Sequence, residues 1–162
     1  PNAVSVSNAL GLMQLKMDTA VKDVYVLTYL KDTLPPSEIL FDPRVNVRLG
    51  VAYLFLIQNR FFREINDKKS LEYCTIAAYN AGAGTVLRTF HKDKGEAVKI
   101  INSISSDEVL KRLIGEMDSM QGRRYVQKVL DAKKYFRATE KPALVFGENL
   151  EQTQPQPPPQ DN

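Results

Sequence analysis

The most informative stretch of this sequence is Cys74-Thr-Ile-Ala-Ala-Tyr-Asn-Ala-Gly-Ala-Gly84. It begins with small and apolar residues that favour a helix, and Tyr79 and Asn80 stand just before Gly82 and Gly84. Glycine readily adopts the positive φ with which many helices end, so the pattern predicts a helix terminus here. Taken alone, the pair Tyr79-Asn80 is explained equally well by a helix cap without function and by a binding site.

Outward from this stretch, apolar residues at helical spacing predict a series of short helices. The longest is expected from Asp42-Pro43, a typical N-cap and first position, to Phe62. Other helices are expected over 17–30, after a cap at Ser70, over 85–90, near 98–104, after a capping box at Ser105–Glu108, and over 123–137. No stretch alternates long enough to predict a strand, so the sequence predicts an all-α domain.

The helix over 43–62 is predicted to be the core helix. Val47, Val51, Leu54 and Phe61 recur at helical spacing, and further apolar residues widen this stripe. Gly50 is placed on the same face, where it would let a neighbouring helix approach closely. We therefore expect this helix to be buried on more than one side.

Composition and charge narrow the functional classes. The chain has 162 residues, of which 43% are hydrophobic and 25% charged, and a formal net charge of +3. These values are typical of a globular protein, and the mild positive charge fits either a polyanionic partner or ordinary solubility. The sequence contains no run of Lys and Arg and no Trp, so nothing in it indicates a nucleic-acid partner. With one Cys and one His, no structural zinc site is expected, and the sequence has no Gly-rich phosphate loop, so no cofactor is predicted. No apolar run is long enough to cross a bilayer.

The composition changes near the end of the chain. Residues 151–162 are rich in Gln and Pro, including three consecutive prolines. Such a segment cannot bury a core and is expected to be extended or disordered. We therefore predict a folded domain over residues 1–137 and a C-terminal tail over residues 138–162.

Three polar residues stand out within apolar or Gly-rich surroundings: Gln14, Tyr79 and Asn80. Amides and phenols are neutral hydrogen-bonding groups, which suit hydroxyl and N-acetyl groups better than a phosphate or a cation. Met13, next to Gln14, is suited to the flat face of a sugar ring. Each of these residues also has an explanation in core packing, so a glycan-binding groove is one of two interpretations at this point.

Several ordered motifs together resemble the lytic transglycosylases of the soluble (Slt-like) family, and most closely its membrane-bound C-type members. The resemblance covers about residues 1–137. The motifs that carry it are Ser5 followed by Gly11-Leu12-Met13-Gln14, then Leu40-Phe41-Asp42-Pro43-x-x-Asn46, Ala78-Tyr79-Asn80-Ala81-Gly82, and Arg123-Arg124-Tyr125-x-x-Lys128-Val129.

The resemblance implies a mainly helical, lysozyme-like (goose-type/Slt) catalytic domain with a groove for peptidoglycan glycan strands. Members of the family cleave the β-1,4 bond between N-acetylmuramic acid and N-acetylglucosamine and leave a 1,6-anhydro end, using one glutamic acid and no cofactor. Carried over by motif, Met13, Gln14, Tyr79 and Asn80 would hold the sugars. Ser5 and Tyr125 would lie near the glutamic acid and orient it or the reacting sugar.

The resemblance puts the catalytic glutamic acid in a Glu-Ser-x-x-Asn-Pro pattern whose proline matches Pro1. The general acid is therefore expected upstream of Pro1, and Glu38, Glu64 and Glu72 do not fall at a matching position. The family also implies a location in the periplasm or cell envelope, with an outer-membrane anchor, if present, before Pro1. Two alternatives stay open: a goose-type muramidase, which is a hydrolase, and a peptidoglycan-binding module without catalysis.

Overall fold

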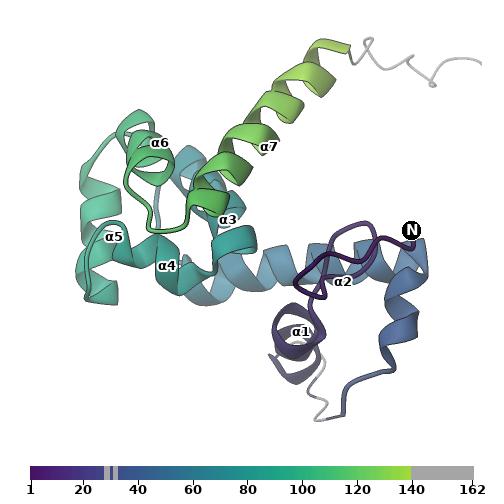
Figure 1. Ribbon diagram of the computed structural model, residues 1–162. Helices are drawn as coiled ribbons and strands as arrows, with labels where there is room; N and C mark the ends of the chain where they lie inside the picture. The colour runs from purple at the N-terminus through teal and green to yellow at the C-terminus, as the bar shows by residue number, and fades with distance from the viewer. Residues whose placement is uncertain (28–29, 31–32, 140–162) are drawn as a thin grey trace, which may run out of the picture. The chain divides into compact units, whose positions relative to one another are not determined.

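The computed structural model describes residues 1–27, 30 and 33–139. The predicted all-α class is confirmed, because the described residues form helices and no strand beyond the isolated bridges Val4–Leu10 and Leu10–Leu15 (Figure 1). The chain divides into two compact units, residues 1–129 and residues 130–162. The predicted tail lies outside the described residues from position 140 onward.

The helical elements follow one another with short connections. In chain order they are the π-helical turn η1 (Met17–Val21), α1 (Lys22–Leu27), the 3-10 turn η2 (Ser37–Phe41), α2 (Pro43–Leu56), the π-helical turn η3 (Ile57–Phe61), α3 (Lys68–Ala81), α4 (Ala83–Arg88), α5 (Lys94–Ser103), α6 (Ser106–Gly115) and α7 (Met120–Thr139). Helix α7 begins in the first unit and ends in the second.

Side-chain caps explain where several helices begin. The Asp42 carboxylate accepts from the backbone N–H groups of Arg44 and Val45 at 2.8 and 3.1 Å, as predicted. Ser105 Oγ likewise accepts from the N–H of Glu108 at 3.2 Å. The predicted cap at Ser70 is wrong, because the Asp67 carboxylate accepts from the Ser70 N–H at 2.7 Å and starts α3 one turn earlier.

The predicted core face of α2 is wrong in part. Val47 and Val51 are 42% and 57% exposed, whereas Asn46, Leu49 and Gly50 are buried. Nearly every side of α2 carries apolar residues, so hydrophobic spacing alone did not determine which side faces inward. Gly50 is approached by a loop side chain and not by a helix: a Cβ there would lie 2.8 Å from Cε of Met13.

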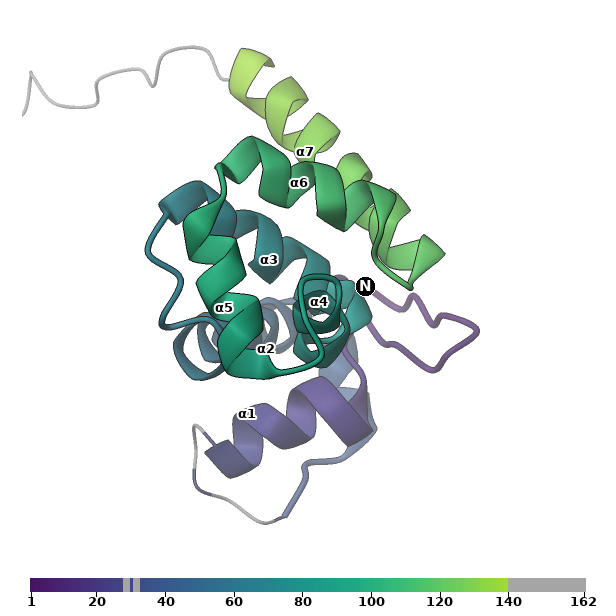
Figure 2. The same cartoon turned by 90° about the vertical axis from the view of Figure 1, so that its left-hand side faces the viewer.

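The first unit is built around two groups of packed helices. One group joins η1 and α1 to α2, with a core of buried apolar residues: Leu15, Ala20, Val21, Val24, Leu40 and Leu49. In the other, α3 packs against α4 and α6, and α4 packs against α5 (Figure 2). The buried face of α3 consists of small side chains, including Cys74, Ala77 and Ala78, which let these neighbours approach closely.

The described part of the second unit is the C-terminal half of α7. Its Tyr135 and Phe136 rings make an edge-on contact with centroids 5.6 Å apart. Thr139 Oγ1 donates to the carbonyl oxygen of Tyr135 at 3.0 Å, within the last turn. Among the described residues, no helix is both long and apolar enough to cross a membrane.

Candidate functional site

The loop from Ala9 to Lys16 has a backbone that only particular residues tolerate. Gly11 and Gln14 adopt positive φ values of 73° and 51°. A Cβ at Gly11 would overlap the Asn46 side chain and the Leu40 carbonyl oxygen, so glycine is required there by space as well as by conformation. Gln14 Nε2 donates to the carbonyl oxygen of Gly11 at 2.9 Å, which helps to hold its own turn.

The side chain of Asn46, in α2, holds this loop in place through hydrogen bonds. Its side chain is fully buried. Its Oδ1 accepts from the N–H of Met13 at 2.7 Å, and its Nδ2 donates to the carbonyl oxygens of Leu10 and Leu40 at 3.0 and 2.8 Å. A single amide thereby pairs with backbone groups of Met13 and Leu40, adds a second donor to the Leu10 carbonyl oxygen that also accepts from the Leu15 N–H, and sets the position of Met13.

Ser5 lies in the segment that precedes this loop. Its Oγ accepts from the N–H of Ala9 at 2.9 Å and lies 3.2 Å from Oγ of Ser7. The N–H of Ser5 donates to the carbonyl oxygen of Ala9, so residues 5–9 form a closed turn. We call residues 5–16 the loop wall.

The end of α3 presents Tyr79 and Asn80. The helix ends at Ala81, and Gly82 follows with φ of 83°, which confirms the predicted terminus. Tyr79 Oη donates to the carbonyl oxygen of Met13 at 2.8 Å, and its ring lies tilted against Tyr53, with centroids 5.7 Å apart. This hydrogen bond joins the end of α3 to the loop wall across 66 positions of sequence.

The start of α7 reaches the same region through Gly122. A Cβ at this buried glycine would lie 3.0 Å from Cβ of Ala81 and 2.7 Å from Cε of Met117. The absence of a side chain therefore lets the first turns of α7 approach the end of α3. Gln121 and Tyr125 are carried with them, and together with residues 79–82 they form what we call the helical wall.

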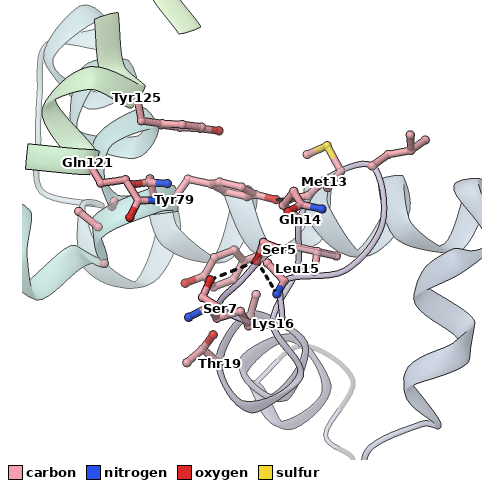
Figure 3. A pocket seen from close by; sticks show the side chains of 18 residues that line it. Ser5, Ser7, Met13, Gln14, Leu15, Lys16, Thr19, Tyr79, Gln121 and Tyr125 are labelled. Carbon is pink, nitrogen blue, oxygen red and sulfur yellow. Dashed lines mark hydrogen bonds between the residues drawn. The ribbon is translucent and has the colours of Figure 1, made fainter. Parts of the chain in front are cut away.

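The two walls enclose a cavity of about 680 Å³. All the residues predicted to serve the site line it, namely Ser5, Met13, Gln14, Tyr79, Asn80 and Tyr125. Figure 3 shows Tyr125 and Gln121 on one side, Met13 and Gln14 on another, and Ser7, Lys16 and Thr19 below them. Segments that are distant in the sequence thus contribute to one concave surface.

The cavity lining combines polar and apolar side chains and is nearly uncharged. Burial, and then the neighbouring phenols Tyr125 and Tyr53, raise the pKa of Tyr79, and burial raises the pKa of Tyr125. Both phenols therefore stay protonated at neutral pH and can donate hydrogen bonds. Among the described residues that line the cavity none is acidic and only Lys16 carries a charge. No cluster of potential metal ligands occurs in the described part of the chain.

Comparison with known proteins assigns the family. The family model described as the transglycosylase SLT domain matches residues 1–102. This chain belongs to that family. The SLT domain is lysozyme-like and all-α, so the predicted fold class is confirmed in both respects.

Two named relatives share one description. The chain is 46% identical over 137 residues to proteins called membrane-bound lytic murein transglycosylase C from Yersinia pestis (strain Pestoides F) and Yersinia pseudotuberculosis serotype O:1b (strain IP 31758). The match covers 85% of this chain and 38% of each relative. The chain thus spans well under half of the length of these SLT relatives.

Several residues that line the SLT cavity were not predicted as site residues. Tyr53 lies on the inward side of α2, and Lys16, Thr19 and Gln121 belong to segments that carried no pattern of their own. Asn46, which orients Met13, occurred in a family motif without an assigned role. An amide side chain within a mostly apolar helical segment is the sequence signal that would have singled it out, because such a group needs hydrogen-bond partners when it is buried.

Proposed function

We propose that this chain forms the substrate groove of a peptidoglycan lytic transglycosylase. The enzyme would cleave the β-1,4 bond between N-acetylmuramic acid and N-acetylglucosamine and leave a 1,6-anhydro end. The observation that carries the proposal is the convergence of Met13, Gln14, Tyr79 and Asn80 on one nearly uncharged cavity. Away from Lys16, such a lining offers hydrogen bonds from neutral groups, which suit hydroxyl and N-acetyl groups.

Each side chain has a role that its geometry supports. Tyr79 Oη already donates to Met13, so the Tyr79 ring is held rigidly and serves as a stable surface for a sugar. Asn80 is exposed at the end of α3, with its amide free to bind substrate groups. Ser5 and Tyr125 lie on opposite walls and supply hydroxyls near the reacting sugar.

The general acid is expected before Pro1, and the position of the N-terminal residues supports this. The carbonyl oxygen of Ala3 accepts from the N–H of Gly11 at 2.9 Å and from Gln14 Nε2 at 3.4 Å. Pro1 is two residues away, so it lies within about 7 Å of Ala3. The chain before Pro1 therefore starts beside the loop wall, and a carboxyl group about five residues earlier is within reach of the cavity.

The reaction needs one carboxyl group if the substrate supplies its own nucleophile. The glutamic acid would protonate the glycosidic oxygen, and the bond from that oxygen to C1 of N-acetylmuramic acid would break. The resulting carboxylate would take the proton of the 6-hydroxyl of the same sugar as its oxygen bonds to C1. Because attack is intramolecular, the second carboxylate of most glycosidases is not required.

The relatives' name supports a substrate in the cell envelope, since murein is peptidoglycan and these proteins are called membrane-bound. We propose an envelope location for this protein, in the periplasm of a Gram-negative cell, with attachment to the outer membrane through a segment before Pro1. Peptidoglycan strands are its proposed partners.

The test is the mass of the products that the full-length protein releases from purified sacculi. We expect fragments with 1,6-anhydro ends, which weigh one water less than fragments with reducing ends. Reducing ends would identify a muramidase instead. Binding to sacculi without any release would identify a binding module, and neither binding nor release would exclude all three functions.

A further inference from the structure

Lys16 is the charged side chain among the described residues that line the cavity. It is half-buried at the end of the loop wall, directly before η1. Figure 3 shows it beside Ser7 and Thr19, on the opposite side of the cavity from Tyr125 and Gln121. The roles proposed above for the sugar-binding residues do not involve it.

Lys16 forms no ion pair with another residue of the described part of the chain. The ion pairs formed among the described residues involve other side chains, and no acidic residue of that part of the chain lines the cavity. A lysine in this position holds a positive potential over one edge of an otherwise neutral surface. Lys16 is half-buried whereas Ser7 and Thr19 beside it are exposed, so a negative group that docks there is attracted by the ammonium group and is partly screened by water and salt.

The neighbours of Lys16 are suited to a carboxylate. The hydroxyls of Ser7 and Thr19 line the same edge, and each can donate a hydrogen bond. An ammonium group flanked by hydroxyls binds a carboxylate through charge-assisted hydrogen bonds, which are about twice as strong as neutral ones. Sugar hydroxyls and N-acetyl groups carry no charge and gain little from the ammonium group.

We propose that Lys16 binds a free carboxylate of the peptide stem carried by the glycan strand, and so makes the groove prefer strands with ionised stems. This inference rests on the proposed function, because the stems project from the muramic acid sugars of the strand that the cavity would hold. It adds a recognition element for the stem to a groove whose other polar side chains suit the sugars. Lys16 is a specificity residue and takes no part in proton transfer.

The test measures binding, so that it does not depend on turnover. Soluble glycan strands with peptide stems are compared with the same strands after their stem carboxylates are converted to methylamides. Methylamidation is preferable to enzymatic removal of the stems, which would uncover a new carboxylate on each muramic acid. The full-length protein is compared with Lys16→Met, Lys16→Arg and the control Lys22→Met, which removes an exposed lysine of α1 outside the cavity.

We expect the unsubstituted protein and Lys22→Met to bind ionised strands about twofold to fivefold more tightly than methylamidated ones, the range for a partly exposed ion pair. Lys16→Met should bind both strands equally, and Lys16→Arg should keep most of the preference. The preference should also shrink as the salt concentration rises.

Equal binding of both strands by the unsubstituted protein would overturn the proposal, and so would a preference that survives in Lys16→Met. In either case strands would still bind, so the proposed groove would stand. Failure to bind any strand would instead remove the proposed function, and the role of Lys16 with it.

Discussion

The loop wall and the helical wall of the cavity are held in place by different interactions. The loop wall depends on hydrogen bonds, with backbone groups of Leu10 and Met13 paired to the buried Asn46 amide. The helical wall depends on close packing of small residues, with Gly122 of α7 against Ala81 of α3. Tyr79 Oη connects the two by donating to the Met13 carbonyl oxygen.

This difference predicts how each wall should lose its stabilising interactions when a residue is substituted or ionised. Hydrogen bonds from one buried amide are lost together when that amide is removed, so several backbone groups lose a donor or acceptor at once. Packing of small residues involves many weak contacts, so a small shift of one neighbour removes only part of it. It is weakened further if a buried group in the packed region becomes charged. The following predictions separate the two kinds of support, from the largest effect on stability to the smallest.

Asn46→Ala should be the most damaging change and should act on the loop wall. It leaves the Met13 N–H and the Leu40 carbonyl oxygen without this partner, and it leaves the Leu10 carbonyl oxygen with the Leu15 N–H alone. We expect a loss of about 3 kcal/mol in the free energy of unfolding, measured in urea. The matched control is Asn59→Ala, where an exposed amide bonded to Phe55 is removed and about 0.5 kcal/mol or less should be lost. Similar losses in both variants would contradict the account of the loop wall.

Alkaline pH should weaken the support of the helical wall. Burial raises the pKa of the Cys74 thiol in α3 from 9.0 to about 12. The stabilisation from this group is therefore complete below pH 9, where the thiol is protonated in both states. It is lost as pH rises toward 12, because the unfolded chain ionises first.

At about pH 10.5 this loss should amount to about 2 kcal/mol relative to pH 8. The measurement is the free energy of unfolding at both pH values for the unsubstituted protein and Cys74→Ala, whose difference isolates the thiol from other titrating groups. An identical decline in the two proteins would show that Cys74 does not ionise on unfolding in this range.

Tyr79→Phe should remove the connection between the walls while leaving both in place. It deletes the hydroxyl that donates to the Met13 carbonyl oxygen but keeps the ring that packs against Tyr53. We expect a loss of about 1 kcal/mol, and a coupling energy between this change and Asn46→Ala in a double-mutant cycle. Tyr73→Phe, on the same helix and outside the cavity, is the control and should be neutral. Full additivity of Tyr79→Phe and Asn46→Ala would indicate that the walls are independent.

The same difference explains how much could be predicted from the sequence. Helix ends depend on local signals, so the caps at Asp42 and Ser105 and the break at Gly82 were predicted correctly. Asp67 and Ser70 are both good N-cap residues, and only the path of the chain decides between them. The inward side of α2 depends on contacts with a distant loop, which hydropathy does not encode.

Gln14, Tyr79 and Asn80 could be named from their surroundings in the sequence, and Ser5 and Tyr125 from family motifs, but the contacts of none of them could be derived. Nothing local indicates that Gly11 needs space for the Asn46 side chain, or that Gly50 needs space for Met13. Those contacts join positions more than thirty residues apart, such as Met13 and Asn46. Lys16 and Gln121 were missed for the same reason, since only the fold brings them to the cavity.

Asn80→Ala should have the smallest effect on stability and a large effect on function. Asn80 is exposed at the end of α3, and the turn after it depends on Gly82, which donates its N–H to the Ala78 carbonyl oxygen at 2.8 Å. The helix end therefore does not need the Asn80 side chain. Its amide lines the cavity, where loss of a hydrogen bond to substrate should slow the reaction.

The most direct measurement is the release of anhydro-ended fragments from sacculi by the full-length protein and by Asn80→Ala, with the thermal unfolding midpoint of each determined in parallel. The account predicts at least about a tenfold fall in release with a midpoint changed by no more than about 2 °C. Unchanged release, or a fall accompanied by a large drop in the midpoint, would contradict the assignment of this cavity as the sugar-binding groove.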